Sequence, residues 1–157
     1  MIRLVLASAL SLAVLTATAS PQRPVLELAG VWRPAEARDA NGRDITDRAE
    51  RTLYIFTRHH FSIQWADTAR SRIHGAPTNS QKVAMWQEFG CQAGTYEVSR
   101  DTLTLRTEIA KSPLAMAPRA FQRFVLTRDS AAIWLQLVAD NSGPLPGQER
   151  ARLVRVE

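Results

Sequence analysis

Short runs in which apolar and polar residues alternate make up most of the chain after residue 26. From Thr102 the order is Thr-Leu-Thr-Leu-Arg-Thr, which places leucines on one side of an extended strand and polar residues on the other. Eight such runs have the length of ordinary strands and are rich in branched and aromatic residues. They span residues 28–35, 52–58, 61–66, 94–99, 102–109, 121–127, 132–138 and 151–156.

The connections between these runs are short and contain turn-forming residues. Asn41-Gly42 supplies the positive backbone angles of a tight turn, and Arg100-Asp101 and Asp129-Ser130 each join two runs with almost no loop. Links this short favour antiparallel neighbours, and an open antiparallel sheet would leave two unpaired edges. The pattern therefore predicts an all-β fold, an eight-stranded antiparallel up-and-down barrel in which the first strand pairs with the last.

One short helix is predicted between the third and fourth strands, in the segment from Pro77 to Gly90. Thr78 and Gln81 have the spacing of a capping box, and Gly90 is suited to the left-handed angle that ends a helix. An apolar stripe at spacings of three is expected to lie against the sheet. It either completes the core as a plug, which we favour because large apolar side chains lose much on exposure, or forms a lid over a cavity. The stripe consists of Val83, Trp86 and Phe89.

The first strand carries a Gly-Val-Trp unit at residues 30–32, and the last strand is rich in arginine. Closure of the barrel would bring these two strands together, so that a guanidinium could stack on the Trp32 indole. Such a cation–π contact contributes about 1 kcal/mol or more when it is shielded from water. The structural motif is therefore expected to join Gly30 and Trp32 with Arg155 or Arg152.

With this motif the chain resembles the bacterial lipocalin-like proteins, within the group of eight-stranded ligand-binding barrels. In that family a Gly-x-Trp unit opens the first strand and an arginine of the last strand packs on the tryptophan. Phe56-Thr57 and Phe61-Ser62 flank a turn as in the relatives, and residues 94–98 match a Gly-x-Tyr strand after the helix. The chain departs from the family in the turn at residues 58–60, where an Asp-Gly pair is usual. It also lacks the disulfide and the helix after the eighth strand that secreted animal lipocalins add.

An eight-stranded barrel has an interior that side chains just fill or that holds one small ligand. If alternate residues face inward, the strands give the interior an aromatic lining, although strand aromatics are more often packed core than pocket wall. An inward Arg123 would pair with Glu97 or Glu108 or meet an acidic ligand, and in the other register it would face solvent. The candidate ligand-binding residues are Tyr54, Phe56, Phe61, Trp65, Tyr96, Arg123 and Leu135.

The first 19 residues have the features of an export signal. A short positive start is followed by an uncharged apolar run from Leu4 to Leu15, and Ala17 and Ala19 are the small residues that a signal peptidase accepts. We expect cleavage after Ala19, a periplasmic or secreted location, and one lipocalin-like domain over residues 20–157. No later stretch has the roughly 20 apolar residues that a membrane span needs, so no integral membrane segment is expected in the mature chain.

Charge and cysteine usage narrow the possible partners. The net charge is +5, but basic residues alternate with acids and form no block, so nucleic acid is not expected as a partner. Cys91 is the single cysteine, which excludes an internal disulfide and leaves a small buried hydrophobe, a reactive thiol or a dimer bridge.

The sequence carries no motif of a metal or catalytic site. Three histidines, Cys91 and Asp67 are the candidate ligands, but they lack the close spacings that present ligands together, so no metal and no cofactor are expected. The fingerprints of hydrolases, phosphate loops and dinucleotide sites are absent from the sequence, and no catalytic residue is predicted. The histidines are His59, His60 and His74.

We therefore expect an exported monomer that binds a small apolar or amphiphilic molecule, with an acidic head as one option, inside the barrel. Two alternatives remain open at this point. In an isomerase- or cyclase-type enzyme, Tyr54, Tyr96 or Arg123 would polarise a carbonyl and a histidine would move a proton. In a protein-interaction module, the barrel would be filled and loops 111–119 and 140–148 would contact a partner.

Overall fold

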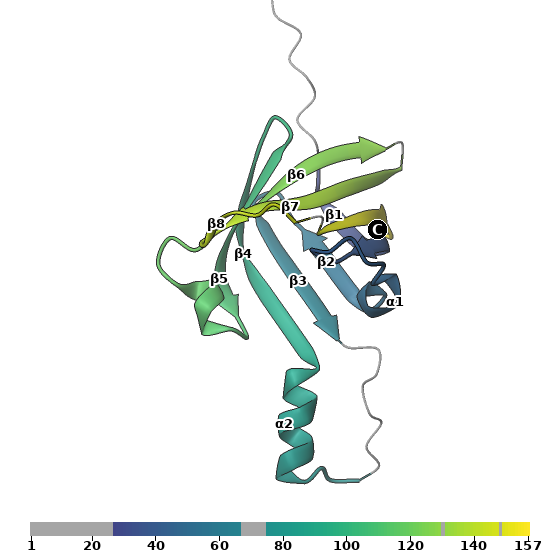
Figure 1. Ribbon diagram of the computed structural model, residues 1–157, viewed down its shortest axis with the longest axis vertical. Coiled ribbons are helices and arrows are strands. Elements are labelled where there is room, and N and C mark those ends of the chain that lie inside the picture. Colours follow the sequence, from purple (N-terminus) through teal and green to yellow (C-terminus); the bar gives the residue numbers. More distant parts are fainter. Residues whose placement is uncertain (1–26, 67–74, 130, 148) are drawn as a thin grey trace, which may run out of the picture.

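The computed structural model describes residues 27–66, 75–129, 131–147 and 149–157 (Figure 1). The expected signal segment 1–19 lies outside the described residues. Eight strands form one closed antiparallel sheet, and a short ninth strand adds to β7. The strands are β1 (Gly30–Arg38), β2 (Thr52–Phe56), β3 (His60–Ala66), β4 (Phe89–Ser99), β5 (Thr102–Ala110), β6 (Gln122–Asp129), β7 (Ala132–Asp140), β8 (Gly143–Pro144) and β9 (Arg150–Arg155).

The barrel closes as the sequence predicts. Each strand from β1 to β7 pairs with its neighbour in the chain, except that β9 lies between β7 and β1. Trp32 faces Arg155 across the closing pair, and a bulge between Pro34 and Glu36 bends β1 along β9. Because β6 also pairs with β7, none of the eight long strands leaves an unpaired edge.

The two ends of the barrel differ in how their strands are connected. At one end, which we call the closed end, tight turns follow β2, β4 and β6. At the other, the open end, the links contain α1 (Thr46–Ala49), α2 (Asn79–Gln87), the short 3-10 helix η1 (Pro113–Met116) and residues 141–149. The difference in loop length places every helix of the described chain at the open end.

The hydrophobic core fills the closed end. Leu103 and Leu153 are completely buried there, and Trp32 is 3% exposed. Its indole Nε1 donates to the Leu28 carbonyl oxygen at 2.8 Å, so the ring lies beneath the entering chain and seals this end. The core cluster contains Leu28, Trp32, Phe56, Phe61, Ile63, Leu103, Leu105, Leu126, Ile133, Leu135 and Leu153.

Of the two arginines expected to pack on Trp32, Arg155 makes the contact. Arg152 instead forms ion pairs with Glu36 at 3.9 Å and Asp129 at 3.6 Å. The Arg155 guanidinium carbon lies 5.6 Å from the centre of the indole ring. Arg155 Nε donates to the Glu157 carbonyl oxygen at 2.9 Å, and Nη2 donates to that of Ala29. The guanidinium thus links the segment before β1 to the segment after β9, above the Trp32 ring.

Helix α2 forms where it is expected, but its packing differs from the prediction. The capping box is present, with Thr78 Oγ1 accepting from the Gln81 backbone and Gln81 Oε1 accepting from that of Thr78. The prediction that α2 completes the core as a plug is wrong, because α2 buries no residue and both Val83 and Trp86 are more than half exposed. The apolar residues from 83 to 86 are consecutive and therefore surround the helix instead of lining one face.

The end of α2 also differs from the prediction. Phe89 belongs to β4, and Gly90 is a strand residue that pairs with Trp65. A Cβ on Gly90 would lie 2.0 Å from the Trp65 ring, so the missing side chain makes room for the indole.

Candidate functional site

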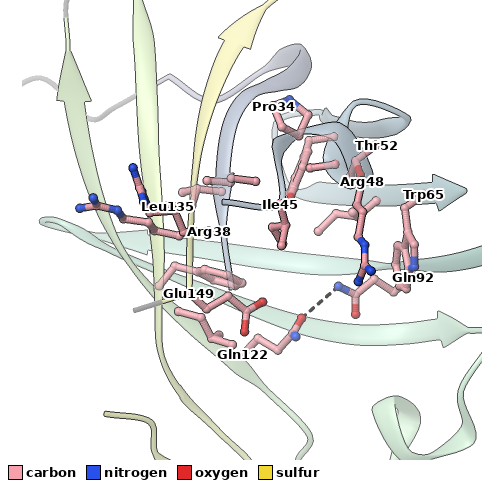
Figure 2. A pocket seen from close by; sticks show the side chains of 18 residues that line it. Pro34, Arg38, Ile45, Arg48, Thr52, Trp65, Gln92, Gln122, Leu135 and Glu149 are labelled. Carbon is pink, nitrogen blue, oxygen red and sulfur yellow. Dashed lines mark hydrogen bonds between the residues drawn. The ribbon is translucent and has the colours of Figure 1, made fainter. Parts of the chain in front are cut away.

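The open end of the barrel contains a cavity of about 440 Å³ (Figure 2). This volume lies within the range of small-molecule sites. Its inner wall is apolar and comes from strands on all sides of the barrel. The apolar lining consists of Pro34, Ala37, Tyr54, Ile63, Trp65, Phe124, Leu135, Leu137 and Ala151.

Helix α1 forms part of the rim of this cavity. The Ala37 backbone N–H donates to Thr46 Oγ1 at 3.0 Å, and the Ile45 N–H donates to the Ala37 carbonyl oxygen at 2.9 Å. These bonds hold α1 against β1, so that Ile45, Arg48 and Ala49 line the mouth. In contrast, no described residue of α2 lines the cavity, and Val83, Trp86 and Phe89, the residues of the alternative lid, do not cover it in this structure.

Two amides form a polar bridge across the cavity. Gln92 Nε2 donates to Gln122 Oε1 at 3.0 Å, from β4 to β6 (Figure 2). Thr107 Oγ1 donates to Gln92 Oε1 at 3.4 Å. These contacts fix Gln92 while the Gln122 amide nitrogen makes no hydrogen bond to another described residue. The bridge can therefore offer a donor to a polar group of a ligand.

Tyr54 and Glu149 are the titratable groups that the cavity perturbs most. Burial raises the pKa of Tyr54 to about 12, with a smaller contribution from the negative charge of Glu149. Burial also raises the pKa of the Glu149 carboxyl, and the charges of Asp39 and Asp140 raise it further. Tyr54 is consequently a neutral hydroxyl donor over the physiological range, and Glu149 holds its proton more readily than an ordinary glutamate.

Three arginines line the mouth, and two of them have partners. Arg38 Nη1 donates to the Gly42 carbonyl oxygen at 3.1 Å, and Arg150 lies 5.1 Å from the centre of the Trp134 ring. The Arg48 guanidinium makes no hydrogen bond or ion pair within the described ranges. Figure 2 shows it reaching from α1 toward Gln92 and Trp65. Arg48 is thus the arginine that is free to meet an anionic group.

The fold, with this cavity at one end, is similar to that of a solved protein. A lipocalin-like protein from Bacteroides uniformis ATCC 8492 superposes with a TM-score of 0.50 at 12% sequence identity, covering 82% of this chain and 97% of the other. This chain has the fold of a lipocalin-like barrel. No protein-family model and no curated protein matches its sequence, so the likeness concerns the fold alone.

The lipocalin-like barrel brings three of the predicted ligand-binding residues to the cavity and places three others in the closed end. Tyr54, Trp65 and Leu135 line the cavity. Phe56 and Phe61 are buried in the core, and Tyr96 meets Phe56 edge-on with ring centres 5.3 Å apart. The Tyr96 hydroxyl donates to the Thr57 carbonyl oxygen at 2.7 Å, and burial raises its pKa. These three aromatics therefore seal the barrel instead of lining its cavity.

The prediction that Arg123 faces the interior is wrong. Arg123 is exposed on the outer face of β6, with its guanidinium carbon 5.2 Å from the centre of the Phe121 ring. The inward residues of β6 are Gln122, Phe124 and Leu126. Alternation on β6 is regular, but the predicted register was one residue off, which moves every side chain to the opposite face.

The polar residues of the cavity were missed for reasons that the structure makes plain. Gln92 precedes the predicted fourth strand, because β4 begins five residues earlier than expected. Arg48 lies in a connection whose charges suggested a solvated surface, and α1 folds that connection over the mouth. Glu149 follows a proline-containing loop. Gln92 and Glu149 each lie two residues outside a predicted strand. Polar residues in such positions were the only sign in the sequence that polar groups line the cavity.

Of the residues named for the enzyme alternative, Tyr54 lines the cavity, and the other described ones lie away from it. Tyr96 is held by the closed-end turn, Arg123 lies outside, and His59 and His60 are exposed at the closed end. Cys91 is half-buried on β4. No group of three metal-binding side chains gathers among the residues described, while His74 and Asp67 lie outside them. None of the described helices is long and apolar enough to cross a membrane.

Proposed function

We propose that this chain is an exported binding protein that holds one small amphiphile in the open end of the barrel. The observation that carries the proposal is the cavity of about 440 Å³, whose apolar wall is combined with uncommitted polar groups at the mouth. An apolar wall favours an aliphatic or aromatic body, and a few placed polar groups orient it. Inside the barrel, the closed end is packed with the buried side chains of the hydrophobic core.

The rim indicates the polar part of the ligand. Arg48 cannot lose its charge, and it has no partner among the described residues, so an anionic head would replace the water around it. The Tyr54 hydroxyl and the free amide hydrogens of Gln122 add neutral donors deeper in the cavity. We infer that the ligand carries its carboxylate, sulfonate or phosphate toward α1 and its apolar body toward Leu135 and Leu137.

Export belongs to the same proposal and has its own test. The uncharged run of residues 4–15 and the small residues before position 20 support cleavage after Ala19. The mass of the protein recovered from the periplasm should correspond to residues 20–157. Recovery of the intact chain from the cytoplasm would contradict export without affecting the cavity.

Ligand binding is tested with a probe of the expected chemistry. The fluorescent sulfonate 1-anilinonaphthalene-8-sulfonate combines an aromatic body with an anionic head, and its emission rises in an apolar site. We expect saturable binding of one molecule, and native mass spectrometry of periplasmic protein should show an adduct if a natural guest is retained.

Matched variants locate the binding. Ala151→Phe adds a ring to the inner wall and should abolish probe binding, whereas Ala35→Phe adds the same ring to the outer face of β1 and should leave binding unchanged. Arg48→Gln should weaken binding of the sulfonate by about tenfold, the loss of one charge-assisted contact of roughly 1.4 kcal/mol. Equal binding by Ala151→Phe and the wild type, with both proteins folded, would contradict the proposal.

A further inference from the structure

Large apolar side chains are exposed mainly at one end of the molecule. Seven such side chains are exposed in the described chain, and all except Val156 lie at the open end. Leu114 is 81% exposed and Ile109 is 70% exposed, while Trp86 and Val83 are each near 60%. A monomeric protein usually scatters such residues singly, so their concentration at one end calls for a partner. We call Val83, Trp86, Ile109, Leu114 and Met116 the open-end apolar surface.

One lysine connects the two elements that carry this surface. Lys111 Nζ donates to the carbonyl oxygens of Trp86 and Phe89, the second at 2.6 Å, and so caps the end of α2. It also lies 5.1 Å from the centre of the Trp86 ring. Because η1 begins two residues after Lys111, these bonds link the end of α2 to the start of the η1 segment. Figure 1 shows α2 projecting below the strands.

The charges around the surface are mainly positive. Only two of the 20 basic residues of the chain are lysines, Lys82 and Lys111, and both lie here. In the described segments 75–89 and 106–119, four basic residues accompany two acidic ones. Lysine and tryptophan are both suited to a boundary between water and hydrocarbon, since each combines an apolar body with a polar tip.

A cleft beside this surface shares two lining residues with the ligand cavity. A cleft lies between α2 and η1, lined by Phe89, Lys111 and Ala115 together with Trp65 and Gln92. Trp65 and Gln92 also line the cavity inside the barrel. Trp65, 43% exposed and seated with its indole over Gly90, therefore lies between the cleft and the cavity.

From these observations we infer that the open end docks on the surface of an anionic lipid bilayer. Leu114, Ile109 and Trp86 would enter the headgroup region, and Lys82 and Lys111 would meet lipid phosphates. A second copy of this chain is a poorer occupant, because two such surfaces would bring like charges together. The inference goes beyond ligand binding and does not depend on it.

Vesicle sedimentation tests the inference with residues 20–157, which contain every strand of the barrel and lack the apolar leader. One set of vesicles contains phosphatidylglycerol and phosphatidylethanolamine, and the other contains phosphatidylcholine alone. No ligand is added. We expect the wild type to sediment with the anionic vesicles, to bind the neutral ones weakly, and to lose binding as salt increases.

Three variants separate the contributions. The double variant Trp86→Ser/Leu114→Ser keeps all charges and should lower the partition coefficient by about tenfold, since two large side chains no longer enter the bilayer. Lys82→Glu should weaken binding to anionic vesicles only. Val156→Ser is the matched control, because it removes an exposed apolar side chain at the closed end and should bind as the wild type does.

The melting temperature of each variant is measured to check that the barrel remains folded. We expect it to be unchanged for the substitutions in α2, because α2 buries no residue. The inference is overturned if the wild type stays in the supernatant, if the double variant sediments like the wild type, or if Val156→Ser loses as much binding. It is equally overturned if sedimentation velocity without lipid shows a dimer that the double variant abolishes, because a second copy then covers the surface.

Discussion

Gly30 has no room for a side chain. A Cβ there would lie 2.6 Å from the Glu157 carbonyl oxygen and 2.7 Å from Arg155 Nε, and the backbone φ of 140° is one that other residues rarely adopt. We expect Gly30→Ala to lower the free energy of unfolding by about 2–4 kcal/mol, because strain and steric overlap act together. Urea unfolding followed by tryptophan fluorescence measures this loss.

Gly143 supplies the control for Gly30. It also has a positive φ, 114°, but nothing lies within 4 Å of where its Cβ would be. Gly143→Ala should therefore lose only the conformational part, about 1–2 kcal/mol. Equal losses in the two variants would mean that the fit around Arg155 contributes nothing to stability.

Glu149 should make stability depend on pH. Burial, followed by the charges of Asp39 and Asp140, raises its pKa above the ordinary 4.5, so the folded state favours the protonated carboxyl. The resulting stabilisation is fully present below pH 4.5 and is lost as pH rises through the raised pKa. Glu149→Gln keeps the neutral form at all pH values, so it should be more stable than the wild type at pH 8 and similar at pH 4.

The comparison of unfolding midpoints at these two pH values isolates Glu149 from other carboxyls. Asp47→Asn is the control, since it removes an exposed carboxylate of α1. It shows what the loss of one exposed negative charge does to the unfolding midpoint at each pH. A Glu149→Gln variant that is no more stable at pH 8 than the wild type would show that the cavity does not penalise the charged carboxyl.

Single residues also show where sequence reasoning succeeds. The contact of Trp32 with Arg155 was predicted because it follows from closure, and closure follows from counting strands. The orientation of Arg123 required the register of one strand, and alternating patterns on β6 are consistent with both faces because Arg123 and Gln122 are both polar. Contacts that follow from the order of the strands could therefore be predicted from the sequence, whereas contacts that depend on the register of one strand could not.

At the scale of elements, α2 should behave as a separate unit from the barrel. Its start is fixed by the capping box, while its side chains contribute little to the core. Thr78→Ala should therefore destabilise the helix locally by about 1 kcal/mol and leave the unfolding midpoint of the barrel nearly unchanged. Hydrogen exchange resolves the two effects, with faster exchange expected only in residues 79–88.

Asn79→Ala is the matched control for Thr78→Ala, because it truncates the next residue of α2 without removing the cap. It should leave exchange in α2 close to that of the wild type. If Thr78→Ala instead lowers the stability of the whole domain, α2 packs on the barrel more firmly than its exposed residues indicate.

The elements were predicted unevenly for a physical reason. Strand positions depend on local alternation and turn chemistry, and all eight predicted strands are present, with ends shifted by a few residues. The role of each helix depends on what it packs against, which the sequence does not state. As a result α2 was expected to complete the core, and α1, which is held at the cavity rim through Thr46 and Ile45, was not predicted.

For the whole molecule, stability and binding belong to opposite ends of one barrel. The closed end has tight turns and the fully buried side chains, including Leu103 and Leu153. The open end has the helices, the cavity and the Arg48 guanidinium, which makes no hydrogen bond or ion pair to another described residue. A barrel built in this way can leave one end hollow because the other end, together with the closed ring of strand pairs, supplies the folding free energy.

Two leucines of the same chemistry test this division. Leu153 is 0% exposed in the closed-end core, and Leu153→Ala should lower the free energy of unfolding by about 3–5 kcal/mol because its partners cannot collapse onto the space. Leu137 is 8% exposed and lines the existing cavity, so its side chain has fewer partners to lose. Leu137→Ala should therefore cost about 1–2 kcal/mol and should change the affinity for the fluorescent sulfonate.

Urea unfolding and probe titration on the same two variants decide the matter. Leu153→Ala, where it remains folded, should keep the probe affinity of the wild type, because the removed side chain lies away from the cavity. If Leu137→Ala is as destabilising as Leu153→Ala and leaves probe affinity unchanged, the open end is part of the packed core in solution. We expect Leu153→Ala to lose stability and Leu137→Ala to change the probe affinity. This difference follows from the tight turns at the closed end and the long connections at the open end.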